Sequence, residues 1–353
     1  MKEHEWYMKR CFQLAKLGAG KVAPNPMVGA VLVYNNIIIG EGYHEQYGQS
    51  HAEVNCINSV KKEQVSLIEK STLYVSLEPC NHFGNTPPCS DLVIKYKIPT
   101  VVIGCKDLNA KVNGSGIKKL EEAGINIVVG VLEKEAMELN RRFFTFHLHK
   151  RPYIILKWAQ SNDNFIAPLQ SGNFKITHLI TDKLVHKWRS ESSAIMVGTK
   201  TALLDNPSLT TRLWEGKNPI RIFIDKNLQV PLDYHLLDGS VPAIIFNTLI
   251  EKTVNNLSYI KYDASINFID QLIKSLYEKE IQSLMVEGGS TLLQSFIDAG
   301  CWDEARVITN TALMLNEGVS SPVISDCVLA KENKIKGDHL HIYNKKVNRE
   351  LIK

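Results

Sequence analysis

Apolar positions in the first half of the chain alternate between helical spacing and short continuous runs. Residues 5–18 place Trp6, Met8, Cys11 and Phe12 at intervals that bring them to one face, which predicts an amphipathic helix. Helices interleaved with strands predict an α/β sandwich around a parallel or mixed sheet. The strands are predicted from apolar runs at 28–33, 37–39, 73–77, 100–104 and 126–130, and further helices at 51–60, 91–97, 117–123 and 133–149.

The second half repeats the alternation after a break near residue 150. A basic, aromatic stretch at 141–151 is followed by Pro152 and a new apolar run at 153–157. We therefore predict two domains, 1–150 and 151–353. Later strands are predicted at 194–198, 220–225, 243–246, 283–287 and 305–309, and helices at 181–189 and 291–299. A final edge strand is predicted from the apolar alternation of Leu340, Ile342 and Tyr343.

Composition narrows the classes of protein that fit. The 353 residues are 44% apolar, enough for ordinary buried cores, and carry a formal net charge of +4. Lysine and arginine are interspersed with aspartate and glutamate, so we expect no nucleic-acid surface, and no apolar run approaches the ~20 residues that span a membrane. Seven cysteines without a secretory leader predict reduced thiols in a cytoplasmic protein.

Candidate chemistry lies in three short pieces of the first ninety residues: His51 with Glu53, Cys80 after a proline, and Cys89. One imidazole and two thiolates form a three-ligand zinc set whose fourth position is open to water. A polar pair, Gln49-Ser50, would cap the predicted helix and put His51 and Glu53 in its first turn. Cys80 would open a segment after a buried strand, where a helix N-terminus favours thiolate. Zinc-dependent deaminases use this pattern, with a glutamate that moves protons rather than binding metal.

The spacing of the two cysteines separates candidate classes. Nucleoside and nucleic-acid deaminases use P-C-x-x-C, whereas eight residues separate Cys80 from Cys89 here. A purely structural zinc would need a fourth protein ligand, and the nearby candidates, His44 and His82, are at unfamiliar spacing. The pattern therefore favours a catalytic zinc site of a less common type.

Two polar loops in the second half follow predicted strands. Gly288 and Gly289, directly after Glu287, would let backbone N–H groups approach a phosphate, although they do not form the G-x-G-x-x-G of a Rossmann site. On local evidence alone a plain turn is the stronger interpretation. The other loop carries Asp205 and Arg212, and a guanidinium suits bidentate contact with phosphate.

At these motifs the chain resembles the riboflavin-biosynthesis family of fused pyrimidine deaminases and reductases, called RibD or RibG. The resemblance covers about residues 5–325. It implies a cytidine-deaminase-like three-layer sandwich followed by a dihydrofolate-reductase-like α/β domain that uses NADPH. The matching stretches are 24–29, 40–44, 51–53, 78–89, 106–109 and 112–116 in the first half, and 151–163, 171–172, 176–177, 185–189, 197–201, 205–212 and 286–289 in the second.

The resemblance also implies residue roles in the first half. His51, Cys80 and Cys89 would bind Zn²⁺, and Glu53 would be the catalytic proton shuttle. The family usually has a basic residue where Asn85 stands, which leaves one substrate contact unassigned. The pyrimidine or its ribityl-phosphate side would be held by Asn25, His44, Asp107 and Asn109.

In the second half, the resemblance implies that Arg189 and Arg212 bind the substrate phosphate. Asn164 stands where the family usually has glycine, and we expect it to adopt a left-handed conformation that asparagine tolerates. The cofactor and substrate cleft would be lined by Lys157, Thr201, Asp205, Glu287, Gly288 and Gly289.

The implied activity has two steps. Zinc-dependent hydrolytic deamination of 2,5-diamino-6-ribosylamino-4(3H)-pyrimidinone 5′-phosphate would be followed by NADPH-dependent reduction of the ribosyl group to ribityl. The partner would be a small phosphorylated pyrimidine, without nucleic acid or membrane, and the sequence leaves a homo-oligomer open. Two alternatives stay open: a nucleoside or nucleic-acid deaminase with an appended domain, and a reductase with a non-catalytic, zinc-stabilised first domain.

Overall fold

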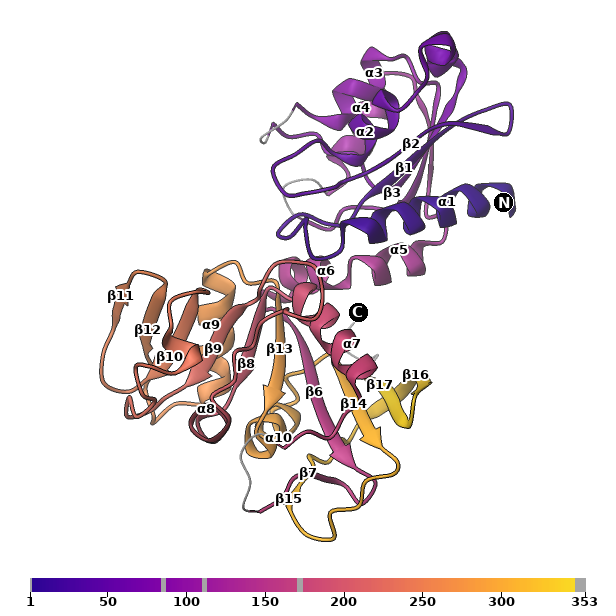
Figure 1. The fold of residues 1–353 in the computed structure, drawn as a ribbon. Coiled ribbons are helices and arrows are strands. Elements are labelled where there is room, and N and C mark those ends of the chain that lie inside the picture. Colours follow the sequence, from indigo (N-terminus) through magenta and orange to yellow (C-terminus); the bar gives the residue numbers. More distant parts are fainter. Residues whose placement is uncertain (1, 84–86, 110–112, 170–173, 347–353) are drawn as a thin grey trace. The chain divides into compact units, whose positions relative to one another are not determined.

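Two compact units make up the chain, Met1–Lys150 and Arg151–Lys353. The structure, a computed structural model, describes residues 2–83, 87–109, 113–169 and 174–346 (Figure 1). Each unit has its own β-sheet and its own buried apolar clusters.

The N-terminal unit is a three-layer sandwich. Its five-stranded sheet has the order β2-β1-β3-β4-β5; β1 is antiparallel to β2 and β3, and β3, β4 and β5 are parallel. Helices α2, α3 and α4 pack on one face, and α1, α5 and α6 on the other (Figure 1). The bounds are α1 Lys2–Ala15, β1 Gly29–Tyr34, β2 Ile37–Tyr43, α2 Ala52–Asn58, β3 Thr72–Leu77, α3 Cys89–Lys95, β4 Thr100–Cys105, α4 Ser115–Glu122, β5 Asn126–Val129, α5 Glu133–Leu139 and α6 Arg141–His149, with 3₁₀ turns at Lys16–Gly18 and Lys62–Lys70.

Burial on both faces explains why the central strands read as continuous apolar runs. Along β1, Ala30 and Leu32 contribute to the core under α2, whereas Val31 and Val33 contribute to the core under α1. A strand covered on both sides has no polar face and so lacks alternation. The apolar runs therefore located this sheet well, and the predicted α/β sandwich is confirmed.

The predicted helix over 133–149 is wrong in one respect: it is two helices, α5 and α6, which meet at Asn140. Asn140 has φ −108° and ψ 24°, and it is 3% exposed. Its side-chain oxygen accepts the N–H of Met27 at 2.8 Å, and its amide group donates to the carbonyl of Met27 at 2.9 Å. This contact with a residue 113 positions away fixes the break, and the local apolar pattern carries no sign of it.

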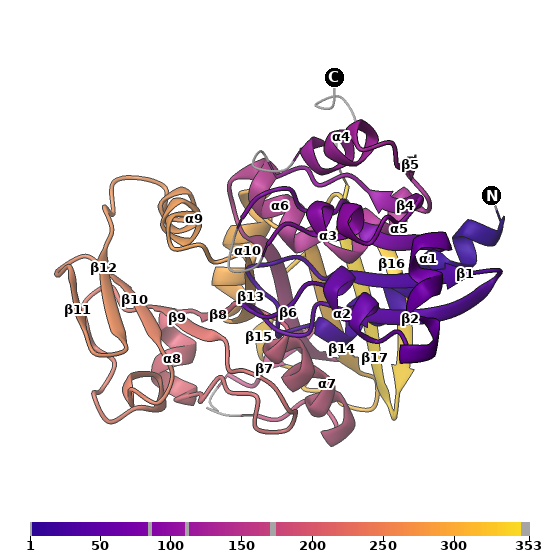
Figure 2. The ribbon, with the colours of Figure 1, turned by 90° about the horizontal axis from the view of Figure 1, so that it is seen from above.

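The C-terminal unit is built on a ten-stranded sheet of order β11-β12-β10-β9-β8-β13-β6-β14-β17-β16 (Figure 2). The strands from β12 to β14 are parallel, and antiparallel strands close both edges. Helices α9 and α10 pack on one face, and α7 and α8 on the other. The bounds are β6 Tyr153–Ser161, β7 Phe165–Ala167, α7 Leu179–Ser190, β8 Ala194–Val197, α8 Thr199–Asp205, β9 Ile220–Ile224, β10 Ala243–Asn247, β11 Lys252–Val254, β12 Leu257–Lys261, α9 Phe268–Glu278, β13 Ser283–Gly288, α10 Ser290–Asp298, β14 Glu304–Asn310, β15 Val319–Ser320, β16 Cys327–Ile335 and β17 Asp338–Lys345, with a 3₁₀ turn at His235–Leu237.

The end of the chain corrects the predicted edge strand. Leu340 and Ile342 lie on β17, which pairs with β14 and is therefore an inner strand. The edge is β16, whose side chains are mostly exposed. An exposed strand shows no apolar alternation, because neither face must be buried, so the pattern identified only the inner partner.

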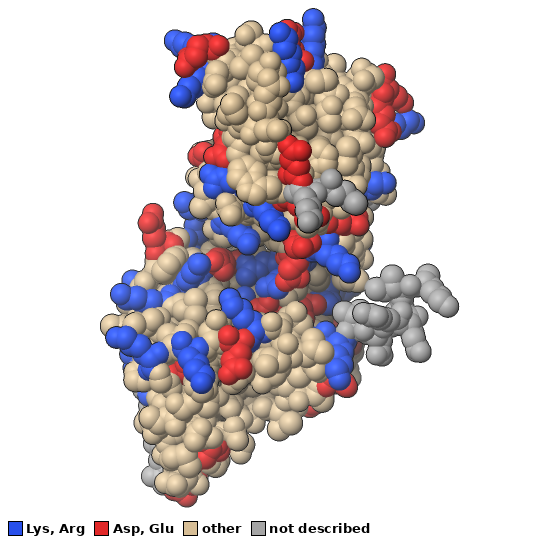
Figure 3. Space-filling model, turned by 90° about the vertical axis from the view of Figure 1, so that its right-hand side faces the viewer, with Lys and Arg blue, Asp and Glu red and all other residues tan. Residues whose placement is uncertain are grey.

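Two observations on the whole chain bear on partners. Within the described ranges no helix combines the length and the apolar character needed to cross a membrane. Lys and Arg side chains are intermingled with Asp and Glu on the visible face of each unit (Figure 3).

Candidate active sites

The three candidate metal ligands come together at one end of the N-terminal sheet. His51 lies at the start of α2, Cys80 follows β3, and Cys89 is the first residue of α3. The Nδ1 atom of His51 is 3.5 Å from the Sγ of Cys80 and 3.4 Å from the Sγ of Cys89. The three atoms all lie within 4.8 Å of one another.

These distances fit a zinc ion. Tetrahedral zinc, with bonds of about 2.0 Å to nitrogen and 2.3 Å to sulfur, separates its nitrogen and sulfur ligands by about 3.5 Å. The spacing measured here matches that value, and two soft thiols with one imidazole are the donor set that zinc prefers. Among the described residues neither His44 nor His82 joins the group, so there is no fourth protein ligand.

Local structure around the ligands corrects two expectations. His51 is itself the N-cap residue of α2, and no side chain caps that helix. Cys80 is in a loop rather than a helix, so the helix N-terminus belongs to Cys89. The N–H of Cys89 donates to the Sγ of Cys80 at 3.4 Å. Hydrogen bonds from the Cys89 thiol and then from His51 lower the pKa of Cys80 to about 4, which favours the metal-binding thiolate.

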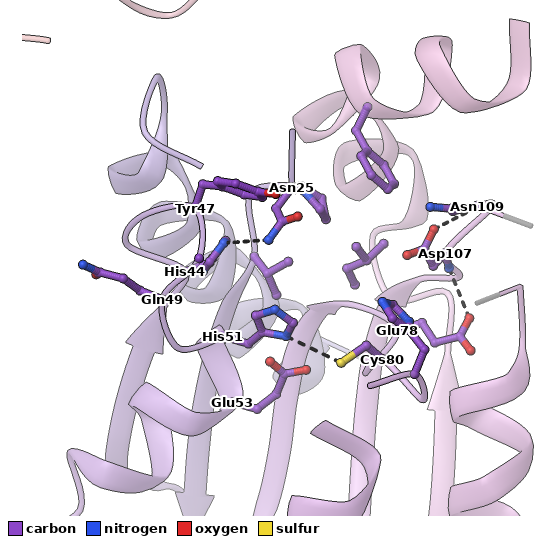
Figure 4. Close-up of a pocket in the computed structure, with 16 residues that line it drawn as sticks. Asn25, His44, Tyr47, Gln49, His51, Glu53, Glu78, Cys80, Asp107 and Asn109 are labelled. Carbon is purple, nitrogen blue, oxygen red and sulfur yellow. Dashed lines mark hydrogen bonds between the residues drawn. The ribbon is translucent and has the colours of Figure 1, made fainter. Parts of the chain in front are cut away.

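Glu53 is placed as the predicted proton shuttle requires. It lies in the first turn of α2 and is only 3% exposed. Its carboxylate points toward the space beside His51, in the cavity wall (Figure 4). Burial raises the pKa of Glu53, which brings its proton affinity closer to what general acid–base catalysis at neutral pH requires.

All four predicted substrate contacts of the first half line one cavity of about 290 Å³, together with the metal ligands His51 and Cys80 (Figure 4). The Nδ1–H of His44 donates to the carbonyl of Ser50 at 3.0 Å, so its Nε2 accepts from the amide of Asn25 at 3.2 Å. Burial lowers the pKa of His44, which keeps the imidazole neutral. On the opposite wall, the N–H of Asn109 donates to Asp107 at 2.8 Å, and burial raises the pKa of Asp107 to about 6.

Several residues that line the cavity were not predicted from the sequence. Asn85 lies outside the described residues. Glu78, directly before Pro79-Cys80, could have been suspected from its place in the motif. Tyr47 and Phe143 also line the cavity, and the sequence carries no recognisable signal for either of them.

In the C-terminal unit, Lys157, Arg189 and Glu287 form a buried charge cluster from β6, α7 and β13. The Arg189 guanidinium donates to both Glu287 oxygens at 2.8 and 2.7 Å, and the Lys157 Nζ is 3.7 Å from the same carboxylate. Burial would raise the pKa of Glu287, but Arg189 and then Lys157 outweigh it and lower the pKa to about 2. Glu287 is therefore ionised at neutral pH.

The predicted glycines form a tight turn against α8. Gly289 has φ +82°, a conformation that glycine adopts without strain. A Cβ on Gly288 would lie 2.9 Å from the Cγ2 of Thr201, so this methyl group would have to shift to admit a side chain there. Asp205 ends α8, at the start of the polar loop that continues to Arg212.

The predicted phosphate ligands differ in their surroundings. Arg189 is committed to Glu287 and to the carbonyl of Thr210, which its Nη1 contacts at 3.1 Å, whereas Arg212 is exposed. Asn164 has φ +65°, which confirms the expected left-handed conformation.

Comparison with known proteins decides the family. The family described as the cytidine and deoxycytidylate deaminase zinc-binding region matches residues 1–105, and the RibD C-terminal domain matches residues 152–317. The riboflavin biosynthesis protein RibD of Aquifex aeolicus is 41% identical over 320 residues, covering 89% of this chain and 88% of its own. That of Escherichia coli is 33% identical over 323 residues, covering 86% and 87%. The chain belongs to the RibD family.

Solved structures agree with the RibD assignment. A deaminase/reductase from Thermotoga maritima, described as acting on diaminohydroxyphosphoribosylaminopyrimidine and 5-amino-6-(5-phosphoribosylamino)uracil, has a TM-score of 0.89 and 35% identity, covering 98% of this chain and 99% of its own. Acinetobacter baumannii RibD has a TM-score of 0.87 at 26% identity, covering 98% and 99%. A RibD enzyme is a bifunctional deaminase and reductase of riboflavin biosynthesis that uses Zn²⁺ and NADPH. This match argues against a nucleic-acid deaminase with an unrelated second domain.

Proposed function

We propose that this chain deaminates 2,5-diamino-6-ribosylamino-4(3H)-pyrimidinone 5′-phosphate and then reduces the ribosyl group of the product to ribityl. Residues 1–150 carry the first reaction and residues 151–353 the second. The observation that carries the proposal is the buried Glu53 carboxylate beside a three-ligand metal set, in a cavity lined by polar side chains. A structural metal site has no need of such a carboxylate.

In the deamination, His51, Cys80 and Cys89 hold the zinc ion. When bound, zinc lowers the pKa of a water ligand to about 7 and so supplies a nucleophile at neutral pH. Glu53 accepts a proton from the attacking water at its carboxylate and passes it to the exocyclic amine, which leaves as ammonia. Its raised pKa suits both directions of this transfer.

The substrate is oriented by groups on two walls of the cavity. His44 holds the Asn25 amide, whose free carbonyl then accepts from the ring substituents. Asp107, with a pKa raised to about 6, takes part as an acceptor or a donor according to pH. Contacts of this kind bind the substrate so that the reacting carbon lies close to the attacking oxygen.

In the reduction, NADPH supplies the hydride when bound. Gly288 and Gly289 let the backbone approach the cofactor phosphates, and Thr201 packs on the same turn. Lys157 and Asp205 face the reacting sugar, and Glu287 orients Lys157 through their ion pair. Arg212 binds the substrate phosphate, because its exposed guanidinium is accessible to a ligand. Arg189 contributes positive charge to the same site from its ion pair with Glu287.

The remaining features concern partners and location. The partner is a small phosphorylated pyrimidine. Its seven cysteines are all unpaired thiols, as expected for a protein of the reducing cytoplasm.

A coupled assay on the purified protein tests the proposal. Ammonia release and NADPH oxidation are followed separately with the diaminopyrimidine ribosyl phosphate, and zinc is measured on the same sample. We expect ammonia first and NADPH oxidation only after deamination. NADPH oxidation with the pre-deaminated substrate, but no ammonia despite bound zinc, would contradict the deaminase assignment and favour a reductase with a structural first domain.

A further inference from the structure

Glu78 is a buried carboxylate with an unusual set of partners. It directly follows β3, two positions before the metal ligand Cys80, and is 4% exposed. No arginine or lysine pairs with it within the described residues. Instead its carboxylate accepts four backbone N–H groups, those of Asp107 at 3.2 Å, Gly114 at 3.1 Å, Gly116 at 3.0 Å and Ile117 at 3.3 Å.

The four donors belong to two segments that are separate in sequence. Asp107 lies in the loop after β4, and its own carboxylate accepts the N–H of Asn109, so a hydrogen bond joins the two cavity residues. Gly114, Gly116 and Ile117 lie at the start of α4, where N–H groups have no partner within the helix and favour a negative charge. One carboxylate thus joins the loop to the helix.

Close packing links the same segments to the metal site. A Cβ on Gly116 would lie 2.0 Å from the carbonyl oxygen of Pro79, so α4 rests directly on the residue before Cys80. The Asn81 amide also donates to the carbonyl of Ser115 at 3.3 Å. The cavity wall carrying Asp107 is therefore fixed relative to the metal ligand through Glu78 and its neighbours.

We propose that Glu78 is a positioning residue for deamination, which sets the Asp107–Asn109 wall at the correct distance from the metal centre. The role rests on the proposed function, because it assumes that this wall contacts the substrate. Within the described residues, no hydrogen bond joins the Glu78 carboxylate to a metal ligand or to Glu53. Its loss should therefore weaken substrate binding more than the chemical step.

Glu78→Gln is the sharpest test, because it keeps the shape of the side chain. A carboxylate offers acceptors on both oxygens, whereas glutamine turns one of them into a donor that opposes two N–H groups. We expect KM for deamination to rise about ten- to hundredfold, kcat to change less than about threefold, and zinc content to stay unchanged. The rate of reduction of the pre-deaminated substrate serves as an internal reference.

Hydrogen exchange gives a readout that is independent of activity. In the wild type the amides of Asp107, Gly114, Gly116 and Ile117 should be protected, and in Glu78→Gln they should exchange about tenfold faster or more. A matched control is Glu41→Gln, which removes another carboxylate from the same unit. Glu41 accepts from Arg10 at 2.6 and 2.8 Å and does not line the cavity, so its loss should leave KM unchanged.

The outcomes separate this role from the proposed function. Faster exchange with raised KM supports it, and Glu78→Asp, which keeps the charge but has a shorter reach, should then give an intermediate KM. An unchanged KM, a loss of zinc, or equal effects of Glu78→Gln and Glu41→Gln would overturn it. If the wild type released no ammonia, the proposed function would be wrong. Faster exchange at these amides in Glu78→Gln would still show, in that case, that the Glu78 carboxylate holds the loop and the start of α4.

Discussion

The two units solve the problem of buried charge in different ways. Among the described residues of the N-terminal unit, no basic side chain forms a hydrogen bond or ion pair with the carboxylates of Glu53 and Glu78, and Glu78 is held by backbone N–H groups. In the C-terminal unit, Glu287 is paired with two cations from other elements. The first arrangement leaves the carboxylates without a basic partner, whereas in the second the charge of Glu287 is balanced within the cluster.

The same contrast appears in what each unit presents to a substrate. In the N-terminal unit, one cavity is lined by the candidate metal ligands His51 and Cys80 and by all four predicted substrate contacts of that unit. In the C-terminal unit, the predicted residues are divided among a charge cluster, a glycine turn and a half-buried polar loop that ends at the exposed Arg212. A reaction carried out by side chains requires those side chains at fixed distances, so its residues lie close together. A large cofactor is bound over a wider area, by backbone groups and loops as well as by side chains.

Removal of zinc should give the largest difference between the units. Deamination should fall about 10⁴-fold or more, because the metal supplies several kcal/mol of activation. Reduction of the pre-deaminated substrate should change by less than about twofold. We would dialyse the protein against a chelator, measure the rates of deamination and of reduction, and repeat both measurements after zinc is added back. Loss of both activities after dialysis would show that the two units do not act independently.

Glu53→Gln sharpens the comparison within one unit. The variant keeps the shape of the side chain but cannot carry a proton, so kcat for deamination should fall about 10³-fold. Zinc content and the reductase rate should be unchanged. A residual rate within about tenfold of wild type would mean that another group moves the proton.

The structure brings together the three candidate metal ligands that the sequence named, and the reason they could be named is physical. Metal ligation depends on side-chain type, so His51, Cys80 and Cys89 are recognisable by their identity and spacing. The support around them is not recognisable. Glu78 acts through backbone N–H groups of residues about thirty to forty positions away, which no local pattern encodes.

For the fold, the strands that are buried on both faces were predicted from their apolar runs, whereas helix α9, the break between α5 and α6, and the edge strand β16 were not. Helix α9 was missed although Asn267 gives a clear signal, since its side chain accepts from the N–H groups of Ile269 and Asp270. The break at Asn140 and the edge strand β16 had no local signal, because a distant contact fixes the first and solvent exposure removes the pattern of the second.

Glu287→Gln tests the balanced cluster of the C-terminal unit. It leaves Arg189 and Lys157 buried without a counter-charge, so we expect this unit to lose about 3 kcal/mol or more of unfolding free energy and most of its reductase activity. Deamination should be unaffected. The control is Glu332→Gln, which removes an exposed charge beside His341 and should cost less than about 0.5 kcal/mol.

The pH dependence of the same pair provides a second check. Because the pKa of Glu287 is lowered from 4.5 to about 2 in the folded state, its stabilisation is complete above pH 4.5 and is lost as the pH falls toward 2. The difference in unfolding free energy between wild type and Glu287→Gln should shrink over that window. A difference that stays constant would contradict the ionised pair.

Gly288→Ala should have the smallest effect, and it probes the part of the reductase unit that depends on backbone. The new Cβ would meet the Cγ2 of Thr201 at 2.9 Å, a methyl group that can move by a few tenths of an ångström. We expect a loss of about 1 kcal/mol and a several-fold rise in KM for NADPH. Thr201→Ser removes that methyl group, so the double variant should recover most of the stability in a double-mutant cycle. If the losses in the two single variants add up in the double variant, the contact with Thr201 is not the reason that glycine is needed at this position. The close approach of the backbone in the turn, rather than packing against α8, would then be the reason.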